Sequence, residues 1–351
     1  MTALTPPGPA DGPARAGRFG GVLFALGDAA ALGTAVAAAV GTQLSPYELR
    51  AFDGGEHKCR PLVGVRNRDV YVLSSLDGAR SASVNDELCR LLFFVGALRD
   101  ASARSVTAVV PYLAYARKDR RTKARDPVTS RYVAQLFEAV GTDRVVVVDV
   151  HNPAAFENAF RCRTDHLEAA GLFVEHVRTQ VPIGPDRGRV VVVSPDLGGA
   201  KRAERFRSLL ETATGADAGL AFVGKHRSRG VVSGSPEIHG DVSGATALVV
   251  DDLIASGTTM ARVAGQLRAR GAASVHLFAT HAPFTAQAGP ALFGAGTVDS
   301  VVVTDSVAPG RLASTVTAGR LVVLSLAGLL AEALRRIDTG GSISELLQLE
   351  T

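Results

Sequence analysis

The sequence has few cysteines, no long apolar run and little net charge, and each shortage excludes a class of protein. Its three cysteines form no CxxC pair and no even-numbered framework, so they predict reduced thiols in a cytoplasmic protein. No apolar run reaches the roughly 18–20 residues that a membrane span needs. A net charge of +4, from 38 basic against 34 acidic residues, is too small to indicate nucleic-acid binding. We therefore expect neither a membrane nor a nucleic acid as a partner.

The composition indicates a globular protein, and its length allows two domains of ordinary size. Hydrophobic residues make up 46% and charged residues 21%, which is too apolar for a disordered chain, and 351 residues can form two cores. Met1–Gly21 is rich in Pro, Gly and Ala and lacks the basic-then-apolar order of a secretory signal, so we expect a flexible tail there. We expect an N-terminal domain over 22–160, a C-terminal domain over 161–340 and a C-terminal tail over 341–351.

Short β-branched runs alternate with helical patterns along most of the chain. The strands expected in the first domain are Val70–Ser74, Ser105–Pro111 and Arg144–Asp149. Those expected in the second are Arg189–Ser194, Ala247–Asp252, Ser274–Ala279 and Ser300–Thr304. Helical patterns between them include Asp86–Ala101, Pro127–Val140 and Thr259–Arg270. This order predicts an α/β fold with parallel sheets covered by helices on both faces. Such sheets bind ligands at the carboxyl ends of their strands.

The most informative segment is Ala247–Thr259, with the sequence ALVVDDLIASGTT. An apolar strand ends at Asp251 and Asp252, and a turn of small residues then opens a helix. Gly257 allows a tight turn, and the free N–H groups at the helix start can bind a phosphate together with Ser and Thr hydroxyls. The two carboxylates can accept hydrogen bonds from the hydroxyls of a ribose. An ordinary capped helix is the alternative, but the complete order of features favours a ribose-phosphate site.

Basic residues gather in two loops that each follow an apolar run. Arg117–Arg125 holds six of them, and Lys225–Arg229 holds three together with His226. A basic cluster is most often a solvated surface. Because α/β folds carry their ligand loops at such positions, a small polyanion such as a nucleotide is the other interpretation.

Val249–Thr259 resembles the phosphoribosyl-binding motif that phosphoribosyltransferases share with ribose-phosphate pyrophosphokinases. Four further segments resemble the pyrophosphokinases alone. They are Tyr115–Arg120 (YARKDR, similar to the family's YARQDR), Asp149–His151 (DVH, similar to DLH), Val193–Gly199 (VSPDLGG, similar to VSPDxGG) and Lys225–Arg227 (KHR, similar to a mobile KxR loop). The resemblance runs from about Phe52 to Val307. It implies two similar phosphoribosyltransferase-type domains, each a mainly parallel sheet flanked by helices.

The resemblance also implies the reaction, in which the pyrophosphoryl group of MgATP moves to the C1 hydroxyl of ribose 5-phosphate. The implied catalytic residues are Lys225 and Arg227, and the implied Mg²⁺ ligands are His151 and Asp196. The implied ATP-binding residues are Phe52, Gly54, Glu56, Arg117 and Lys118. The implied ribose 5-phosphate-binding residues are Asp251, Asp252, Ala255, Ser256, Gly257, Thr258 and Thr259. Phe52–Lys58 (FDGGEHK) resembles the family's adenine-binding loop of the form FxDGE. A homo-oligomer of dimers assembled into hexamers is implied as well, because this loop commonly comes from a neighbouring subunit.

Three positions depart from the family's pattern. Gly54 stands where the family has Asp or Asn, which removes one polar contact to adenine. Lys118 replaces Gln and adds a positive charge near ATP. Ala255 stands where many members have Asp, which removes a carboxylate near the reacting hydroxyl. Two alternatives therefore stay open. One is a catalytically weak regulatory homologue. The other is a phosphoribosyltransferase of nucleotide salvage, which needs neither the YARKDR nor the KHR segment.

Overall fold

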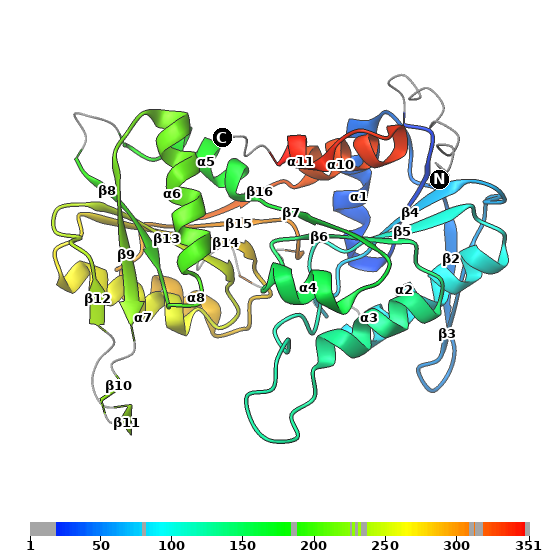
Figure 1. Ribbon diagram of the computed structural model, residues 1–351, viewed down its shortest axis with the longest axis horizontal. Coiled ribbons are helices and arrows are strands. Elements are labelled where there is room, and N and C mark those ends of the chain that lie inside the picture. Colours follow the sequence, from blue (N-terminus) through cyan, green and yellow to red (C-terminus); the bar gives the residue numbers. More distant parts are fainter. Residues whose placement is uncertain are drawn as a thin grey trace, which may run out of the picture.

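The protein folds into two α/β units that lie side by side (Figure 1). The structure is a computed structural model that describes residues 19–78, 82–183, 188–224, 227–228, 231–232, 237–308, 312 and 319–347. Helices cover both faces of the two main sheets, so the predicted α/β class is confirmed. Among the described helices, none is long and apolar enough to cross a membrane.

The first sheet has five parallel strands in the order β1-β4-β5-β6-β7. These strands are β1 (Val22–Ala25), β4 (Asp69–Leu73), β5 (Ser105–Val109), β6 (Arg144–Val148) and β7 (Arg163–Leu167). The helices of this part of the chain are α1 (Ala30–Val40), which follows the short 3-10 helix Gly27–Ala29, α2 (Val84–Asp100), α3 (Thr129–Ala139), α4 (Pro153–Ala159) and α5 (Ala170–Gln180), of which α5 packs against α6 of the second unit. A separate antiparallel hairpin consists of β2 (Tyr47–Ala51) and β3 (His57–Pro61). The central strands are valine-rich and buried along most of their length, as strands covered on both faces must be.

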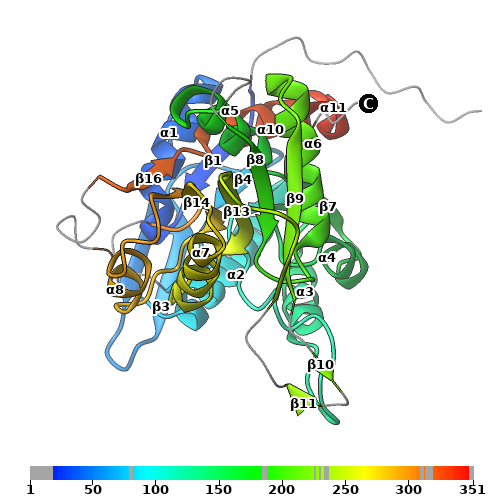
Figure 2. The ribbon, with the colours of Figure 1, turned by 90° about the vertical axis from the view of Figure 1, so that its left-hand side faces the viewer.

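The second sheet has seven strands in the order β12-β9-β8-β13-β14-β15-β16, and among them β12 alone runs antiparallel. The strands are β8 (Val190–Ser194), β9 (Ala218–Gly224), β12 (Glu237–His239), β13 (Thr246–Leu253), β14 (Ser274–His281), β15 (Ser300–Thr304) and β16 (Leu321–Leu324). The helices are α6 (Ala200–Thr214), α7 (Thr258–Ala269), α8 (Ala288–Phe293), α10 (Ala327–Thr339) and α11 (Ile343–Leu346). Two short strands, β10 (Arg227–Ser228) and β11 (Val231–Val232), pair with each other. Helices α6 and α7 pack on opposite faces of the large sheet (Figure 2).

One hydrophobic core joins the two units. Helices α1 and α10 pack together, although one follows the first strand and the other lies near the end of the chain. The ring of Phe278 on β14 lies 5.6 Å from that of Phe173 on α5 and 5.7 Å from that of Phe206 on α6. Because this core contains side chains of both sheets, such as Val146 on β6 and Leu248 on β13, it fixes how the carboxyl ends of the two sheets face each other.

Three features of the structure bear on the domain limits expected from the sequence. Strand β7 pairs with β6 in the first sheet, so a boundary at residue 160 falls one strand too early. Phe19 is buried against Tyr71, and the Gly20 N–H donates to Asp338 Oδ2 at 2.7 Å, so the expected tail over 1–21 is packed at its end. Helix α11 lies in the expected C-terminal tail over 341–351. Phe19 and Gly20 contact residues that are distant in the sequence, so local pattern could not reveal their packing.

Candidate active site between the two domains

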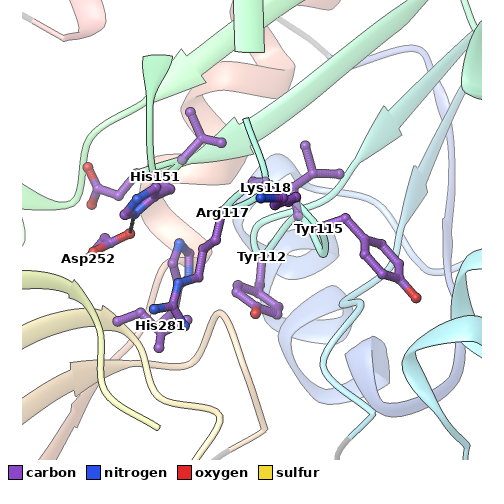
Figure 3. A pocket seen from close by; sticks show the side chains of 12 residues that line it. Tyr112, Tyr115, Arg117, Lys118, His151, Asp252 and His281 are labelled. Atoms are coloured by element: carbon purple, nitrogen blue, oxygen red, sulfur yellow. Dashed lines mark hydrogen bonds and ion pairs between the residues drawn. The ribbon is translucent and has the colours of Figure 1, made fainter. Parts of the chain in front are cut away.

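The carboxyl ends of β6 and β13 meet across the boundary between the two domains. Asp149 and His151 follow β6, and Asp251 and Asp252 lie at the end of β13. His151 Nδ1 lies 2.7 Å from Asp252 Oδ2 (Figure 3). The two residues are separated by 101 positions in the chain, so this contact depends on the docking of the domains.

Arg202, in the first turn of α6, joins the same group of charged side chains. Its Nη1 lies 3.0 Å from Asp251 Oδ1 and 3.4 Å from Asp252 Oδ1. Four charged or ionisable groups thus form a continuous chain from His151 to Asp251. The arrangement places one cation beside two adjacent carboxylates, which would otherwise repel each other.

The pKa values of His151, Asp251 and Asp252 depend on the charges of their neighbours. Burial raises the pKa of Asp252, but the hydrogen bond with His151 and the charge of Arg202 together hold it below its ordinary value. Burial and the neighbouring Asp252 raise the pKa of Asp251. The hydrogen bond to Asp252 raises the pKa of His151. Asp252 is therefore the ionised carboxylate of the pair, and it can accept hydrogen bonds from a ligand.

Two cavities open beside the His151–Asp252 contact, and both residues line both cavities. The larger has a volume of about 1050 Å³, and Asp196, Arg202 and Asp251 are among its lining residues. The smaller has a volume of about 430 Å³ and is lined by Arg117 and Lys118. The inter-domain cleft therefore brings together the residues expected to bind metal, ribose and ATP phosphates.

The expected phosphate loop forms the start of α7. Gly257 has φ +72°, and a Cβ atom there would lie 2.6 Å from Leu292 Cγ, so glycine is required at this turn. Ser256 Oγ lies 2.9 Å from Thr258 Oγ1. The N–H groups of the first helical turn point out of the helix end, as a phosphate-binding helix start requires. Ala255 lies in this turn and its carbonyl accepts from the Thr285 N–H at 3.1 Å.

Lys118 lines the smaller cavity, but its charge is compensated within its own loop. Its Nζ lies 2.6 Å from Asp126 Oδ2. The same Asp126 carboxylate accepts hydrogen bonds from the Thr122 hydroxyl and from the backbone N–H groups of Thr122 and Lys123. These bonds with Lys118 and three further donors hold the pKa of Asp126 well below its usual range. The expected extra positive charge is therefore part of a loop-closing ion pair.

The hairpin of β2 and β3 lies at the far end of the first domain from the second (Figure 1). Phe52, Gly54 and Glu56 lie at its tip, where the Phe52 N–H donates to the Glu56 carbonyl at 2.7 Å. The Phe52 ring is 43% exposed, with the Arg50 guanidinium 5.2 Å from its centroid. None of these residues lines either cavity of the described chain. Within one chain, the structure does not bring the expected adenine loop to the cavities lined by His151 and Asp252.

Two expected residues belong to the β9–β12 connection. Lys225 lies outside the described residues. Arg227 begins β10, which pairs with β11 beyond the lower edge of the second sheet (Figure 1).

Comparisons with known proteins agree with this geometry. Residues 21–141 match the model of the N-terminal domain of ribose phosphate pyrophosphokinase, and residues 232–348 match that of the phosphoribosyl synthetase-associated domain. A ribose-phosphate pyrophosphokinase from Parasynechococcus marenigrum is 37% identical over 89% of this chain and 89% of its own length. One from Hyphomonas neptunium is 36% identical over 90% of this chain and 96% of its own.

The chain belongs to the ribose-phosphate pyrophosphokinase family.

A solved structure from the same family has the same fold. The phosphoribosylpyrophosphate synthetase from Mycobacterium smegmatis superposes with a TM-score of 0.80 at 31% identity, over 91% of this chain and 99% of that one. The likeness spans both sheets, so two phosphoribosyltransferase-type domains describe the ribose-phosphate pyrophosphokinase fold of this chain.

The structure also shows residues near the site that sequence patterns did not single out. Arg202 contacts both carboxylates of β13, and its position in the first turn after VSPDLGG could have revealed it. Asp119 accepts from Asn152 Nδ2 at 2.6 Å and lines the larger cavity. Thr280 and His281 contact the β6 end from the second domain. For these last two, no pattern in a single sequence gives a signal, because only domain docking brings them to the site.

The donor set fits a magnesium ion that takes most of its ligands from substrate. His151 Nδ1 is held by the Asp252 carboxylate, which leaves Nε2 as the ring nitrogen available for a ligand. Asp196 lines the same cavity, with Oδ1 accepting from the Gly199 N–H at 3.0 Å. Among the described residues, these two belong to no group of three or more ligand side chains close enough to share one ion. Magnesium commonly binds through one or two protein ligands, waters and substrate phosphates.

Proposed function

We propose that this protein transfers the pyrophosphoryl group of MgATP to the C1 hydroxyl of ribose 5-phosphate, giving phosphoribosyl pyrophosphate and AMP. The observation that carries the proposal is the 2.7 Å contact between His151 Nδ1 and Asp252 Oδ2. It joins the strand end expected to serve MgATP to the strand end expected to hold the ribose. The names of the relatives that match most of the chain support the same activity.

In this proposal the second domain binds the sugar phosphate. The backbone N–H groups at the start of α7, with the Ser256 and Thr258 hydroxyls, bind the 5-phosphate. Asp252 and Asp251 accept hydrogen bonds from the ribose hydroxyls. Arg202 keeps both carboxylates in place and lowers their mutual repulsion. Since Ala255 carries no carboxylate, Asp251 and Asp252 are the side chains of this strand end that could accept the proton of the C1 hydroxyl.

The first domain binds the triphosphate. Arg117 lines the smaller cavity beside His151 and supplies a positive charge for the phosphates (Figure 3). We propose His151 and Asp196 as the protein ligands of Mg²⁺. When bound, magnesium neutralises phosphate oxygens and helps to orient the triphosphate for in-line attack. Lys225 and Arg227 are proposed to stabilise the charge that grows on the β-phosphate and on the bridging oxygen.

The adenine contact is proposed to come from a second copy of the chain. Phe52 and Glu56 lie on a hairpin tip that lines neither cavity of its own chain. A dimer-based homo-oligomer, assembled into hexamers, would bring that tip to a neighbour's nucleotide. Full activity of a protein that analytical ultracentrifugation shows to be monomeric would contradict the shared adenine site.

The described cysteines are free thiols, and we propose the reducing cytoplasm as the setting.

The deciding experiment mixes purified protein with ATP, Mg²⁺ and ribose 5-phosphate. We expect AMP and phosphoribosyl pyrophosphate to appear in equal amounts, and Lys225→Ala to lose turnover while retaining nucleotide binding. Tight binding without AMP release for any pentose phosphate would refute the proposal and favour the regulatory homologue. Consumption of phosphoribosyl pyrophosphate with a free base, without ATP, would favour a salvage phosphoribosyltransferase.

A further inference from the structure

The turn that carries His151 spans the gap between the domains and is held from the second domain. Val148 ends β6, Asp149 follows it, and His151 lies two residues further on. Asp149 has φ +39°, a conformation that costs a non-glycine residue free energy unless its surroundings enforce it. The turn therefore needs fixed contacts to keep its shape.

His281, at the carboxyl end of β14, supplies one of these contacts. Its Nε2 lies 2.9 Å from the Val148 carbonyl oxygen. Since a carbonyl can only accept, Nε2 carries the hydrogen and donates it. Its Nδ1 lies 2.9 Å from Ser306 Oγ. Burial lowers the pKa of His281, which favours the neutral ring with its hydrogen on Nε2. The Ser306 hydroxyl lies within hydrogen-bond distance of both Nδ1 and the Thr280 carbonyl oxygen, to which it donates at 3.0 Å.

The residue before it supplies a second contact. Thr280 Oγ1 donates to Asp149 Oδ2 at 2.5 Å. The same carboxylate oxygen accepts from the Ala169 N–H at 3.0 Å, so the side chain of Asp149 joins β14 of the second domain to the end of β7 in the first. The third contact is the one between His151 and Asp252. Three attachments along one short turn, at Val148, Asp149 and His151, thus come from β13 and β14.

We infer that Thr280 and His281 form an inter-domain clamp that positions the His151 turn against Asp252, and that His281 is a positioning residue for pyrophosphoryl transfer. His281 is 3% exposed and both ring nitrogens are used within the protein. It therefore acts through the turn and not by bonding to substrate. The kinetic effect expected of the clamp rests on the proposed function, whereas its structural effect rests on the geometry alone.

The clamp predicts a distinctive kinetic effect. The phosphate loop lies wholly in the second domain and Arg117 wholly in the first, so each substrate should still bind when the clamp is lost. What changes is the relative position of the two reacting groups, and a misplacement of about 1 Å can cost roughly 100-fold in rate. We expect His281→Leu to lower kcat about 100-fold while the dissociation constants of ATP and ribose 5-phosphate, measured separately, change little.

Matched variants separate positioning from stability. Gln can place an amide N–H near the position of His281 Nε2, so His281→Gln should recover most of the lost kcat. His276 lies on the same strand, and its Nδ1 is 2.8 Å from Ser300 Oγ, but it sits at the opposite end of β14 from the cleft. His276→Leu should therefore lower the melting temperature by a comparable amount and leave kcat nearly unchanged. Equal kcat losses in His281→Leu and His276→Leu, or no loss in His281→Leu, would overturn the clamp.

Hydrogen–deuterium exchange tests the same inference without activity. In His281→Leu, peptides that contain residues 148–152 should exchange faster than in the wild type, whereas in His276→Leu they should not. Unchanged exchange over 148–152 in His281→Leu would refute the clamp even if the enzyme assay were uninformative. If the wild type releases no AMP but residues 148–152 still exchange faster in His281→Leu than in the wild type, the result counts against the proposed reaction and supports the clamp.

Discussion

Glu87 on α2 is expected to make the stability of this protein fall as the pH rises from about 4.5 to 7. Its side chain is 8% exposed and accepts from the Gly78 N–H at 2.8 Å. A carboxylate oxygen of Glu87 and those of Asp28 and Asp77 all lie within 4.8 Å of one another. Burial raises the pKa of Glu87 to about 7 and the two carboxylates add to the rise, although the Gly78 hydrogen bond opposes it.

The sign and size of the effect follow from proton linkage. The folded-state pKa of about 7 lies above the ordinary value of 4.5, so between these values the folded state holds a proton that the unfolded chain has lost. Stability therefore decreases with pH across this window and is level above it. At about 1.4 kcal/mol per pKa unit, the penalty amounts to about 3 kcal/mol at pH 8. With an unfolding entropy of about 2.1 cal/mol/K per residue, that corresponds to about 4 °C in Tm.

Glu87→Gln removes the ionisation and keeps an oxygen that can accept from the Gly78 N–H. We expect its Tm, relative to the wild type, to rise by about 4 °C between pH 4.5 and pH 8, measured by calorimetry with a chelator so that no divalent cation screens the carboxylates. Asp86→Asn is the control, because Asp86 lies next to Glu87 on the exposed side of the same helix start and its pKa is lowered by the hydrogen bonds to Ser83. It should lose stability at pH 8. A Tm difference for Glu87→Gln that does not change with pH would refute the reasoning.

Two further predictions concern the loops of the site. Gly257→Ala should cost about 1–3 kcal/mol of stability and raise the KM for ribose 5-phosphate, because φ is +72° and the Cβ atom meets Leu292. Gly265→Ala, in open space within α7, should instead stabilise the protein slightly in the same thermal assay. Asp126→Asn should raise the KM for ATP several-fold, because Asp126 pairs with Lys118 and accepts from the Thr122 hydroxyl, and the substitution removes its charge. An unchanged KM in steady-state kinetics would show that this ion pair does not support the ATP loop.

The strands that the sequence predicts well are the ones buried on both faces. Arg144–Val148 and Val190–Ser194 are nearly continuous valine runs, and both strands end within a residue or so of the expected limits. Arg163–Leu167 is a strand too, but it lies at the edge of its sheet, is polar and is mostly not fully buried. A polar edge strand has neither the apolar run nor the alternation that marks a strand, so the domain limit expected at residue 160 came before this strand.

The candidate site shows a similar division. The sequence places His151 and Asp252 at the carboxyl ends of parallel strands, which is enough to suggest that both bind ligands. It cannot show that they touch, because the strands belong to different sheets. It also cannot show that Lys118 is neutralised by Asp126, eight residues away on a folded loop. Residue types and spacing identify chemical groups, whereas distances between groups on separate elements depend on packing.

The contacts between the two domains are apolar in their shared core and polar at the candidate site, and this difference affects how the site is aligned. The core that the two sheets share is apolar, and in it the ring of Phe278 packs against those of Phe173 and Phe206. At the site the contacts that hold the turn are polar, from Thr280 and His281 to the end of β6. Apolar packing supplies stability with little demand for direction, whereas hydrogen bonds specify geometry at a modest net gain in stability. Substitutions in the polar contacts should therefore change catalytic alignment more than folding, and substitutions of Phe278 should do the reverse.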